Sequence, residues 1–458
     1  MSEKKVVIIG AGCAGLNAAY TLKKNGVDFL LLDDQETYGG RVRSFYFDPE
    51  HPDYYYTRAA IWTEPTEEES RSLLEEFDLM PLYREFDKLL FGFYFNNKIH
   101  PVDMGGNVFE IMTSMKDIPK SIIPQGAKFL KNFAKVRPLL ERREGDSVYG
   151  MDELAQTVAG QSVKDWTLKN AGPEVLDKLI APMANGICAG TEEKISMVQP
   201  LYIMNRIGAV GQIKGGHWGS INKALYEAVK DNVRLNSKVE EIAIADGKVC
   251  GVKLVGGEFI EADQVICCAE ADNALKLLPD APESVKDALA REEYSLSFDY
   301  IMTKPTRRDP QDMQIIMIAP STGSKLCIMF EENAQDLCAA PGSSLMHVYT
   351  SPKFYDEFKA MSEDDRFKAV RAEAAKILPD LADAEFLATY EYGMGEKVHG
   401  MGYQGNDSFN ALLKMEKQYH DEVKGLHLAG CYRVMHCATD GAYTSGRIEA
   451  EAVIAELA

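Results

Sequence analysis

The chain has 458 residues, of which 46% are hydrophobic and 26% charged, so it can bury more than one core and two or three domains are expected. Its formal net charge of −20 would repel a phosphate backbone, which argues against nucleic acid as a partner. No secretory leader and no apolar run of roughly 18 residues is evident, so we expect a cytoplasmic protein. Nine cysteines without CxxC or Cys/His spacing indicate reduced thiols and no metal site.

A glycine motif follows the first apolar run, VVII, which is typical of a buried parallel strand. Gly10, Gly12 and Gly15 stand in the order G-x-G-x-x-G before a segment with helical spacing. Gly10 allows a tight strand-to-helix turn, Gly12 lets a pyrophosphate approach the backbone, and Gly15 permits close helix–strand packing. The anion would then lie on the first helical amides, beside Cys13 and Ala14.

An acidic residue ends the next predicted strand, VDFLLLDD, about 20 residues after the glycines. Asp33 is placed to accept hydrogen bonds from a ribose diol, and its charge would repel a 2′-phosphate. The motif therefore predicts FAD or NAD rather than NADP.

The choice of FAD comes from the stretch DDQETYGGRVRS, where Asp33 is followed by Gly39, Gly40 and Arg41. This pattern resembles the FAD-binding flavoprotein superfamily that contains amine oxidases, protoporphyrinogen oxidases and phytoene-desaturase-like enzymes. The resemblance implies a second glycine turn against the cofactor and an arginine near its diphosphate, a fitting place for a permanent, forked cation.

Three further segments carry the same resemblance. KGGHWGSINKALYEAV with the strands after it resembles the middle block, and GLHLAGCYRVMHCATDGAYTSGRIEAEAV resembles the closing block, whose helix N-terminus would face the flavin pyrimidine. TRAAIW would lie beside the flavin, with Ala59 where the superfamily usually has glycine. The cofactor contacts that these segments imply are Ala60, Trp62, Val239, Gly430, Cys431, Thr439, Asp440 and Ala442.

The separated motifs predict an α/β architecture in which a Rossmann-like FAD-binding domain is discontinuous. We expect this domain at 1–80, 200–290 and 400–458, a mixed α+β substrate domain at 81–106 and 291–399, and a helical insert at 107–199. No second G-x-G-x-x-G follows a strand, so electrons should enter the flavin from a small organic substrate and leave to oxygen or another acceptor.

The stretch APMANGICAGTEEKISM at 181–197 resembles protoporphyrinogen oxidases. Cys431 departs from the polar residue usual after Ala-Gly, and SLSFDYIMTKP lacks an evident flavin lysine, although Lys304 stays open for that role. We therefore expect hydride removal from a C–N or C–C unit. An amine oxidase, a redox-neutral isomerase or mutase, and a partner-dependent subunit remain alternatives.

Residues for proton exchange or substrate contact are less defined, since flavin chemistry needs no nucleophile motif. Tyr392 and His399 are the catalytic candidates, with Trp62, Tyr403 and His436 as further aromatic or proton-exchanging groups. For each of these residues, an ordinary core, rim or solvated position is the alternative.

A basic amphipathic stretch at 119–143 sets Phe129 and Phe133 among lysines. In an acidic chain it could lie on an anionic membrane surface or guide an anionic substrate, with Lys128, Lys131, Lys135 and Arg137 supplying the charge. An ordinary core-packing helix with solvated lysines is the alternative. No oligomeric state is predicted.

Overall fold

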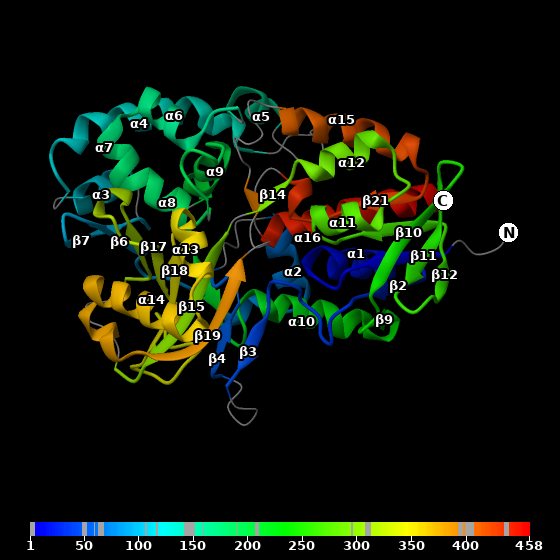
Figure 1. Cartoon of the computed structure of the whole chain (residues 1–458), viewed down its shortest axis with the longest axis horizontal. Helices are drawn as coiled ribbons and strands as arrows, with labels where there is room; N and C mark the ends of the chain where they lie inside the picture. The colour runs from blue at the N-terminus through cyan, green and yellow to red at the C-terminus, as the bar shows by residue number, and fades with distance from the viewer. Residues whose placement is uncertain are drawn as a thin grey trace.

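The fold was analysed in a computed structural model of the whole chain (Figure 1). The structure describes residues 5–47, 53–58, 60–62, 68–105, 108–115, 118–141, 152–158, 160–188, 190–206, 210–294, 296–306, 313–392, 397–398, 407–434 and 439–458. Every cysteine in these ranges is a free thiol. Among the described helices, none combines the length and apolarity needed to cross a bilayer.

A five-stranded parallel sheet forms the centre of one half of the molecule, in the order β21-β13-β1-β2-β9. Its strands come from three distant parts of the chain: β1 (Val6–Ile9), β2 (Phe29–Leu32), β9 (Val233–Arg234), β13 (Gln264–Cys267) and β21 (Leu426–Leu428). The run VVII is buried along its whole length because its side chains alternate between two cores. The predicted α/β fold is confirmed.

Each face of this sheet has its own cover (Figure 1). One face carries α1 (Cys13–Lys24), α10 (Trp218–Val229) and α16 (Thr439–Leu457), and α1 lies directly against α16. The other face lies under an antiparallel sheet and three helices: β10 (Val239–Ala245), β11 (Lys248–Leu254), β12 (Phe259–Glu261), α11 (Ala271–Leu277), α12 (Glu283–Ala290) and α15 (Asp407–Glu422).

A seven-stranded mixed sheet organises the other half, in the order β19-β15-β18-β17-β16-β6-β7. Only β6 and β16 pair in parallel among its neighbours. The strands are β6 (Leu90–Phe95), β7 (Lys98–Asp103), β15 (Ser297–Lys304), β16 (Ile315–Ile318), β17 (Leu326–Glu331), β18 (Ser344–Thr350) and β19 (Glu385–Tyr392). Segments before and after the helical insert thus share one sheet, and α13 (Tyr355–Lys359) and α14 (Glu363–Ile377) flank it.

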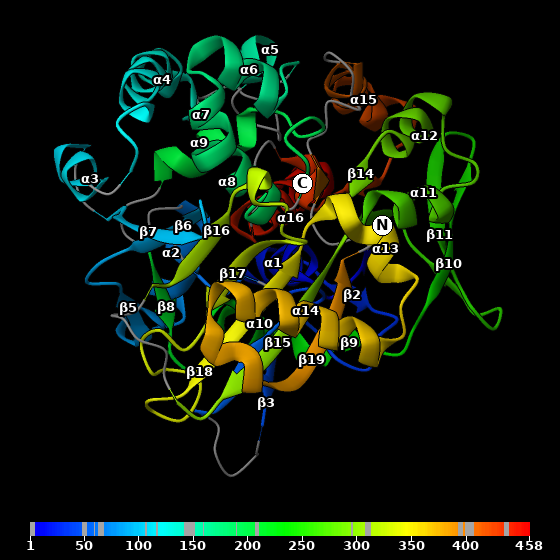
Figure 2. The ribbon, with the colours of Figure 1, turned by 60° about the vertical axis from the view of Figure 1, so that its left-hand side comes forward.

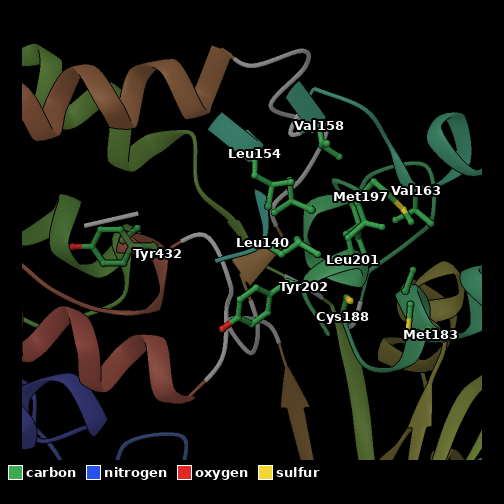
Figure 3. Packing of buried hydrophobic residues seen from close by; sticks show 14 of the residues in the cluster. Leu140, Leu154, Val158, Val163, Met183, Cys188, Met197, Leu201, Tyr202 and Tyr432 are labelled. Carbon is green, nitrogen blue, oxygen red and sulfur yellow. The ribbon is translucent and has the colours of Figure 1, made fainter. Parts of the chain in front are cut away.

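The helical segment lies over the β16–β17 part of that sheet (Figure 2). Its helices are α3 (Val108–Ser114), α4 (Ile122–Val136), α5 (Asp152–Val158), α6 (Val163–Asn170), α7 (Pro173–Val175), η4 (Leu176–Ile180), α8 (Ala181–Gly186) and α9 (Val198–Arg206). Leu154, Val158 and Leu201 point into a shared apolar interior (Figure 3). Gly186 packs so tightly on β17 that a Cβ there would lie 2.6 Å from Ile328, so the helical segment is seated on the sheet.

Short elements connect the halves. They are β3 (Ser44–Tyr46), β4 (Tyr55–Thr57), α2 (Glu68–Glu76), β5 (Tyr83–Glu85), β8 (Gly211–Ile213), β14 (Glu293–Tyr294) and β20 (Lys397–Val398). The pair β5–β8 joins the start of the predicted substrate domain to the residues that lead into α10.

Candidate functional site

The first glycine turn lies between β1 and α1. Gly10 has φ +102°, which favours glycine, and a Cβ on Gly15 would lie 1.8 Å from the Gly10 carbonyl oxygen. Around Gly12, by contrast, a Cβ would find only the Cα of Gly40 within 4 Å, at 3.9 Å. The turn therefore keeps α1 in contact with β1. It also leaves space beside the backbone of Gly12.

Cys13 and Ala14 open α1, and their side chains are buried. The Cys13 Sγ accepts a hydrogen bond from Asn222 Nδ2 at 3.5 Å, and burial raises the pKa of its thiol. The Ala14 carbonyl faces Gly446 of α16, where a Cβ would lie 2.0 Å away. These two residues can therefore offer a ligand their backbone amides rather than their side chains.

Asp33 follows β2 and organises the adenosine end of the candidate site. Its Oδ2 accepts from the Ala11 amide at 2.6 Å, and its Oδ1 accepts from the Gln35 amide at 2.8 Å. Burial raises the pKa of this carboxyl against the lowering effect of those two amides. The Ser237 amide donates to the Asp33 carbonyl at 2.7 Å, which brings the start of β10 at Val239 beside it.

The second glycine turn lies against the first. The Gly39 amide donates to the Ala11 carbonyl at 2.7 Å, and Gly40 has φ +57° with its Cα close to Gly12. Arg41 then reaches Cys431, with Nη2 3.2 Å from Sγ, and its Nε lies 3.5 Å from Glu270 Oε1. Segments almost 400 positions apart therefore meet at one cation.

This arrangement fits FAD. The open backbone at Gly12, the amides at the start of α1 and the Arg41 guanidinium suit a diphosphate. The Asp33 carboxylate keeps acceptor capacity for a ribose diol beyond its two backbone bonds.

An apolar wall stands where the flavin ring is expected. The Trp62 ring lies 5.9 Å from Phe86, 5.9 Å from Phe91 and 5.5 Å from Phe330 between ring centroids. The Trp62 carbonyl accepts a hydrogen bond from Trp218 Nε1, while no described residue pairs with the buried Nε1 of Trp62. An unpaired buried donor beside the expected ring position is suited to a ligand acceptor.

Ala60, two residues before Trp62, has φ +59°, a left-handed conformation that is strained for any residue with a Cβ. The strain falls in the predicted flavin-facing segment, next to the position where the superfamily usually has glycine.

We expect Ala60→Gly to stabilise the protein by about 1 kcal/mol, because removal of the Cβ relieves this strain. The urea midpoint of unfolding, measured with excess FAD, checks this. Ala319 has an ordinary φ of −66°, so Ala319→Gly is the matched control and should destabilise. A lower midpoint for Ala60→Gly than for the unaltered chain would refute the strain argument.

At the C-terminal block, the Gly430 amide donates to Ser445 Oγ at 2.9 Å, and Gly430 has φ +140°. Helix α16 begins at Thr439, and the Asp440 Oδ1 accepts from the Ser70 amide of α2 at 2.6 Å. The Asp440 carboxylate thus joins two helices through Oδ1. Ala442, two residues after Asp440, is partly buried.

The structure tests neither predicted catalytic side chain. His399 lies outside the described residues, and the side chain of Tyr392 is not described. The same holds for Ala59, Tyr403 and His436. Lys304 is described, and its Nζ donates to the Asp380 carbonyl at the end of β15. That contact does not place Lys304 beside Trp62 or Arg41.

Sequence reasoning missed a fully buried charged network that joins the two halves. His347 of β18 lies between two carboxylates, with Nδ1 2.8 Å from Asp299 Oδ2 and Nε2 2.7 Å from Glu332 Oε2. Glu332 Oε1 accepts from both the amide and the hydroxyl of Thr57, at 2.9 and 2.7 Å, and lies 3.5 Å from His217 Nε2. The only sequence signal was a histidine inside the apolar strand SLMHVYT.

Burial alone would lower the pKa of His347, but Asp299 and Glu332 outweigh it and raise the pKa to about 10. Burial would likewise raise the pKa of Glu332, but His347 and His217 outweigh it and lower the pKa to about 2. The pair of His347 and Glu332 is therefore ionised at neutral pH, and Glu332 anchors Thr57 at the end of β4. Burial raises the pKa of Asp299 against the lowering effect of His347.

Comparisons with known proteins show the family to which the chain belongs. A family model described as flavin-containing amine oxidoreductase matches residues 13–454. An L-amino-acid oxidase of Demansia vestigiata is 26% identical over 61% of this chain and 53% of its own length. Protoporphyrinogen oxidase 2 of Arabidopsis thaliana is 27% identical over 43% of this chain and 35% of its own length.

The chain therefore spans about half the length of the first of these relatives and less of the second. A solved structure from Exiguobacterium sp. 255-15, proposed to be a protoporphyrinogen oxidase, shares the fold over all of both chains, with a TM-score of 0.76 and 17% identity. The resemblance predicted from the glycine motifs is confirmed: the chain belongs to the flavin-containing amine oxidoreductase family, with FAD as its cofactor.

Proposed function

We propose that the protein is a FAD-dependent oxidoreductase that removes hydride from an organic substrate, in the manner of protoporphyrinogen oxidases. The observation that carries this proposal is the packing of the two glycine turns beside Asp33 and Arg41. An apolar wall around Trp62, whose carbonyl accepts a hydrogen bond from Trp218 of α10, supports it. Bound FAD would supply a two-electron acceptor there.

The protein's own residues would position and shield the reaction. The rings of Trp62, Phe91 and Phe330 keep water away from a reacting C–H bond. Amides at the start of α16 would stabilise negative charge on a bound flavin. Glu332 holds Thr57, at the end of β4, in place through two hydrogen bonds.

Two features favour a porphyrinogen-like substrate over a lysine-dependent amine reaction. Lys304, the lysine left open for a place near the flavin, is bonded to Asp380. Helix α8, which begins the protoporphyrinogen-oxidase-like stretch, packs on β16 and β17 of the sheet that also contributes Phe91 and Phe330 to the Trp62 wall. An amine oxidase is the second candidate, favoured by the L-amino-acid oxidase relative.

Anaerobic mixing of the holoenzyme with substrate classes tests the proposal. Reduced porphyrinogens, primary and secondary amines, and polyenes are each added while flavin absorbance is followed. We expect porphyrinogens to bleach the flavin and Lys304→Met to leave that rate unchanged. Bleaching by amines alone would overturn the assignment to a protoporphyrinogen-oxidase-like subfamily. Substrate consumption without bleaching would indicate redox-neutral chemistry.

We further propose that α4 contacts an anionic membrane surface. Its inner face is core, since Phe129 is buried with its ring 5.8 Å from that of Trp166. Its outer face exposes Ile123 at 57% and Leu130 at 38%, beside exposed Lys128 and Lys131. The inner face thus fits the core-packing alternative, and the exposed apolar and basic side chains of the outer face support the proposal of membrane contact.

Lys131→Gln is expected to weaken binding to anionic lipid vesicles about fivefold, because each lysine near such a surface contributes about 1 kcal/mol. Vesicle co-sedimentation at low salt measures this. Lys223→Gln removes an equally exposed charge from α10 and should leave binding unchanged. Equal losses in the two variants, or no binding by the unaltered chain, would refute contact through α4.

A further inference from the structure

A cluster of two histidines and a glutamate lies at the β21 edge of the five-stranded sheet, apart from the glycine turns. His420 comes from α15, His427 from β21 and Glu449 from α16. One nitrogen of each ring and one carboxylate oxygen all lie within 4.8 Å of one another. Three separate elements therefore direct ligand atoms to one point.

The hydrogen bonding of Gln264 fixes which nitrogen of His427 carries a proton. Gln264 Nε2 donates to Glu456 Oε2 at 3.0 Å, so its Oε1 faces His427 Nε2, 2.9 Å away, and accepts from it. The other nitrogen, Nδ1, then presents a lone pair to Glu449 Oε2 at 3.2 Å. Two acceptors face each other across this gap, and a cation between them would satisfy both.

The remaining contacts leave Glu449 with capacity for a cation. Tyr419 donates to Oε2 over 3.2 Å, and Arg433 to Oε1 over 3.4 Å, both long for bonds to a carboxylate. His420 Nε2 lies 3.8 Å from the same Oε2.

The charges around the cluster also suit a dication. Glu416 Oε2 lies 4.0 Å from Arg433 Nη1, and Glu456 Oε2 lies 3.9 Å from His427 Nε2. Glu449 and Glu416 therefore lie beside the Arg433 guanidinium, and Glu456 lies beside His427, so several carboxylates gather around the cluster.

We propose that His420, His427 and Glu449 form a zinc-type metal site, with Gln264 orienting His427. Zinc bonds of about 2.0 to 2.1 Å in a tetrahedron separate ligand atoms by about 3.4 Å, close to the 3.2 and 3.8 Å found here. The His420 side chain is 35% exposed, which gives the ion a path in and a fourth position for water. A carbonyl-type acceptor on the distal nitrogen of a histidine ligand is the usual supporting contact.

A second geometric cluster, His217, Glu332 and Cys338, is a poorer candidate. All three residues are buried, and Glu332 Oε1 already accepts both Thr57 bonds. The proposed site differs in having an exposed ligand and a carboxylate with only long bonds. A metal held by His420, His427 and Glu449 would link α15 to β21 and α16.

Equilibrium dialysis of chelator-treated holoenzyme against zinc, with bound metal counted by mass spectrometry, tests the site. We expect one zinc per chain in the presence of millimolar magnesium, since imidazole ligands select zinc over magnesium. His420→Ala should remove this zinc, and Gln264→Leu should weaken binding by about 10- to 100-fold. Asp421→Asn removes an exposed carboxylate one residue away and should bind as the unaltered chain does.

A second measurement separates ligation from misfolding. Zinc should raise the thermal midpoint of the unaltered chain and of Asp421→Asn, but not that of His420→Ala, because only the native state offers all three ligands. Absence of stoichiometric zinc in the unaltered chain would overturn the proposal. Unchanged zinc binding by His420→Ala would overturn it as well.

Discussion

Glu332→Gln is expected to destabilise the folded chain by about 3 to 5 kcal/mol, because it removes one partner of a buried ion pair. The imidazole of His347, fully buried, would lose its 2.7 Å contact to a carboxylate and keep only Asp299. Urea unfolding of the holoenzyme measures the loss. Glu385→Gln is the matched control, since Glu385 is exposed at the start of β19, and it should change stability by less than about 0.5 kcal/mol.

The same network gives a pH dependence with a defined sign. The pKa of Glu332 falls from 4.5 to about 2 on folding, so its contribution is present above pH 4.5 and is lost as pH falls through 2. The pKa of His347 rises from 6.5 to about 10, so its contribution is present below pH 6.5 and is lost as pH rises through 10. Unfolding measured between pH 6.5 and 10 should therefore show falling stability, and a flat profile would contradict an ionised network.

Asp33→Ala is expected to weaken FAD binding by about 1.5 to 3 kcal/mol, or roughly 10- to 150-fold, through loss of a charge-assisted hydrogen bond. The structure adds a second reason, because Asp33 Oδ2 also holds the Ala11 amide of the glycine turn. Titration of apoprotein with FAD, followed by quenching of flavin fluorescence, gives the affinity.

Asp34→Ala is the matched control, since Asp34 is the exposed neighbouring carboxylate and should leave FAD affinity unchanged. Asp33→Asn should recover part of the loss, because its amide oxygen still accepts from Ala11. If Asp33→Ala binds FAD as tightly as the unaltered chain, the ribose lies elsewhere.

The nucleotide-binding half was predictable because its signals are local. Four consecutive apolar residues, three glycines at fixed spacing and an acid at the end of the next strand are all dictated by one βαβ unit. The strain at Ala60 and the hydrogen bond between Ser70 and Asp440 depend on the packed backbone. No local sequence pattern predicts them.

The buried network could not be predicted, because its members are distant in sequence. No member belongs to a local sequence motif. Glu332 and Thr57 are 275 positions apart, and His347 lies in a strand that otherwise reads as apolar. Pairing of β15, β17 and β18 brings Asp299, Glu332 and His347 together, and sheet register is a property of the whole fold.

Release and identification of the bound nucleotide test the central claim most directly. The purified protein is denatured, and the flavin freed into solution is identified by chromatography and counted against protein. Two glycine turns packed together, the Asp33 carboxylate and the Arg41 cation predict one FAD per chain. Recovery of FMN or NAD, or of no nucleotide after reconstitution with FAD, would contradict the account.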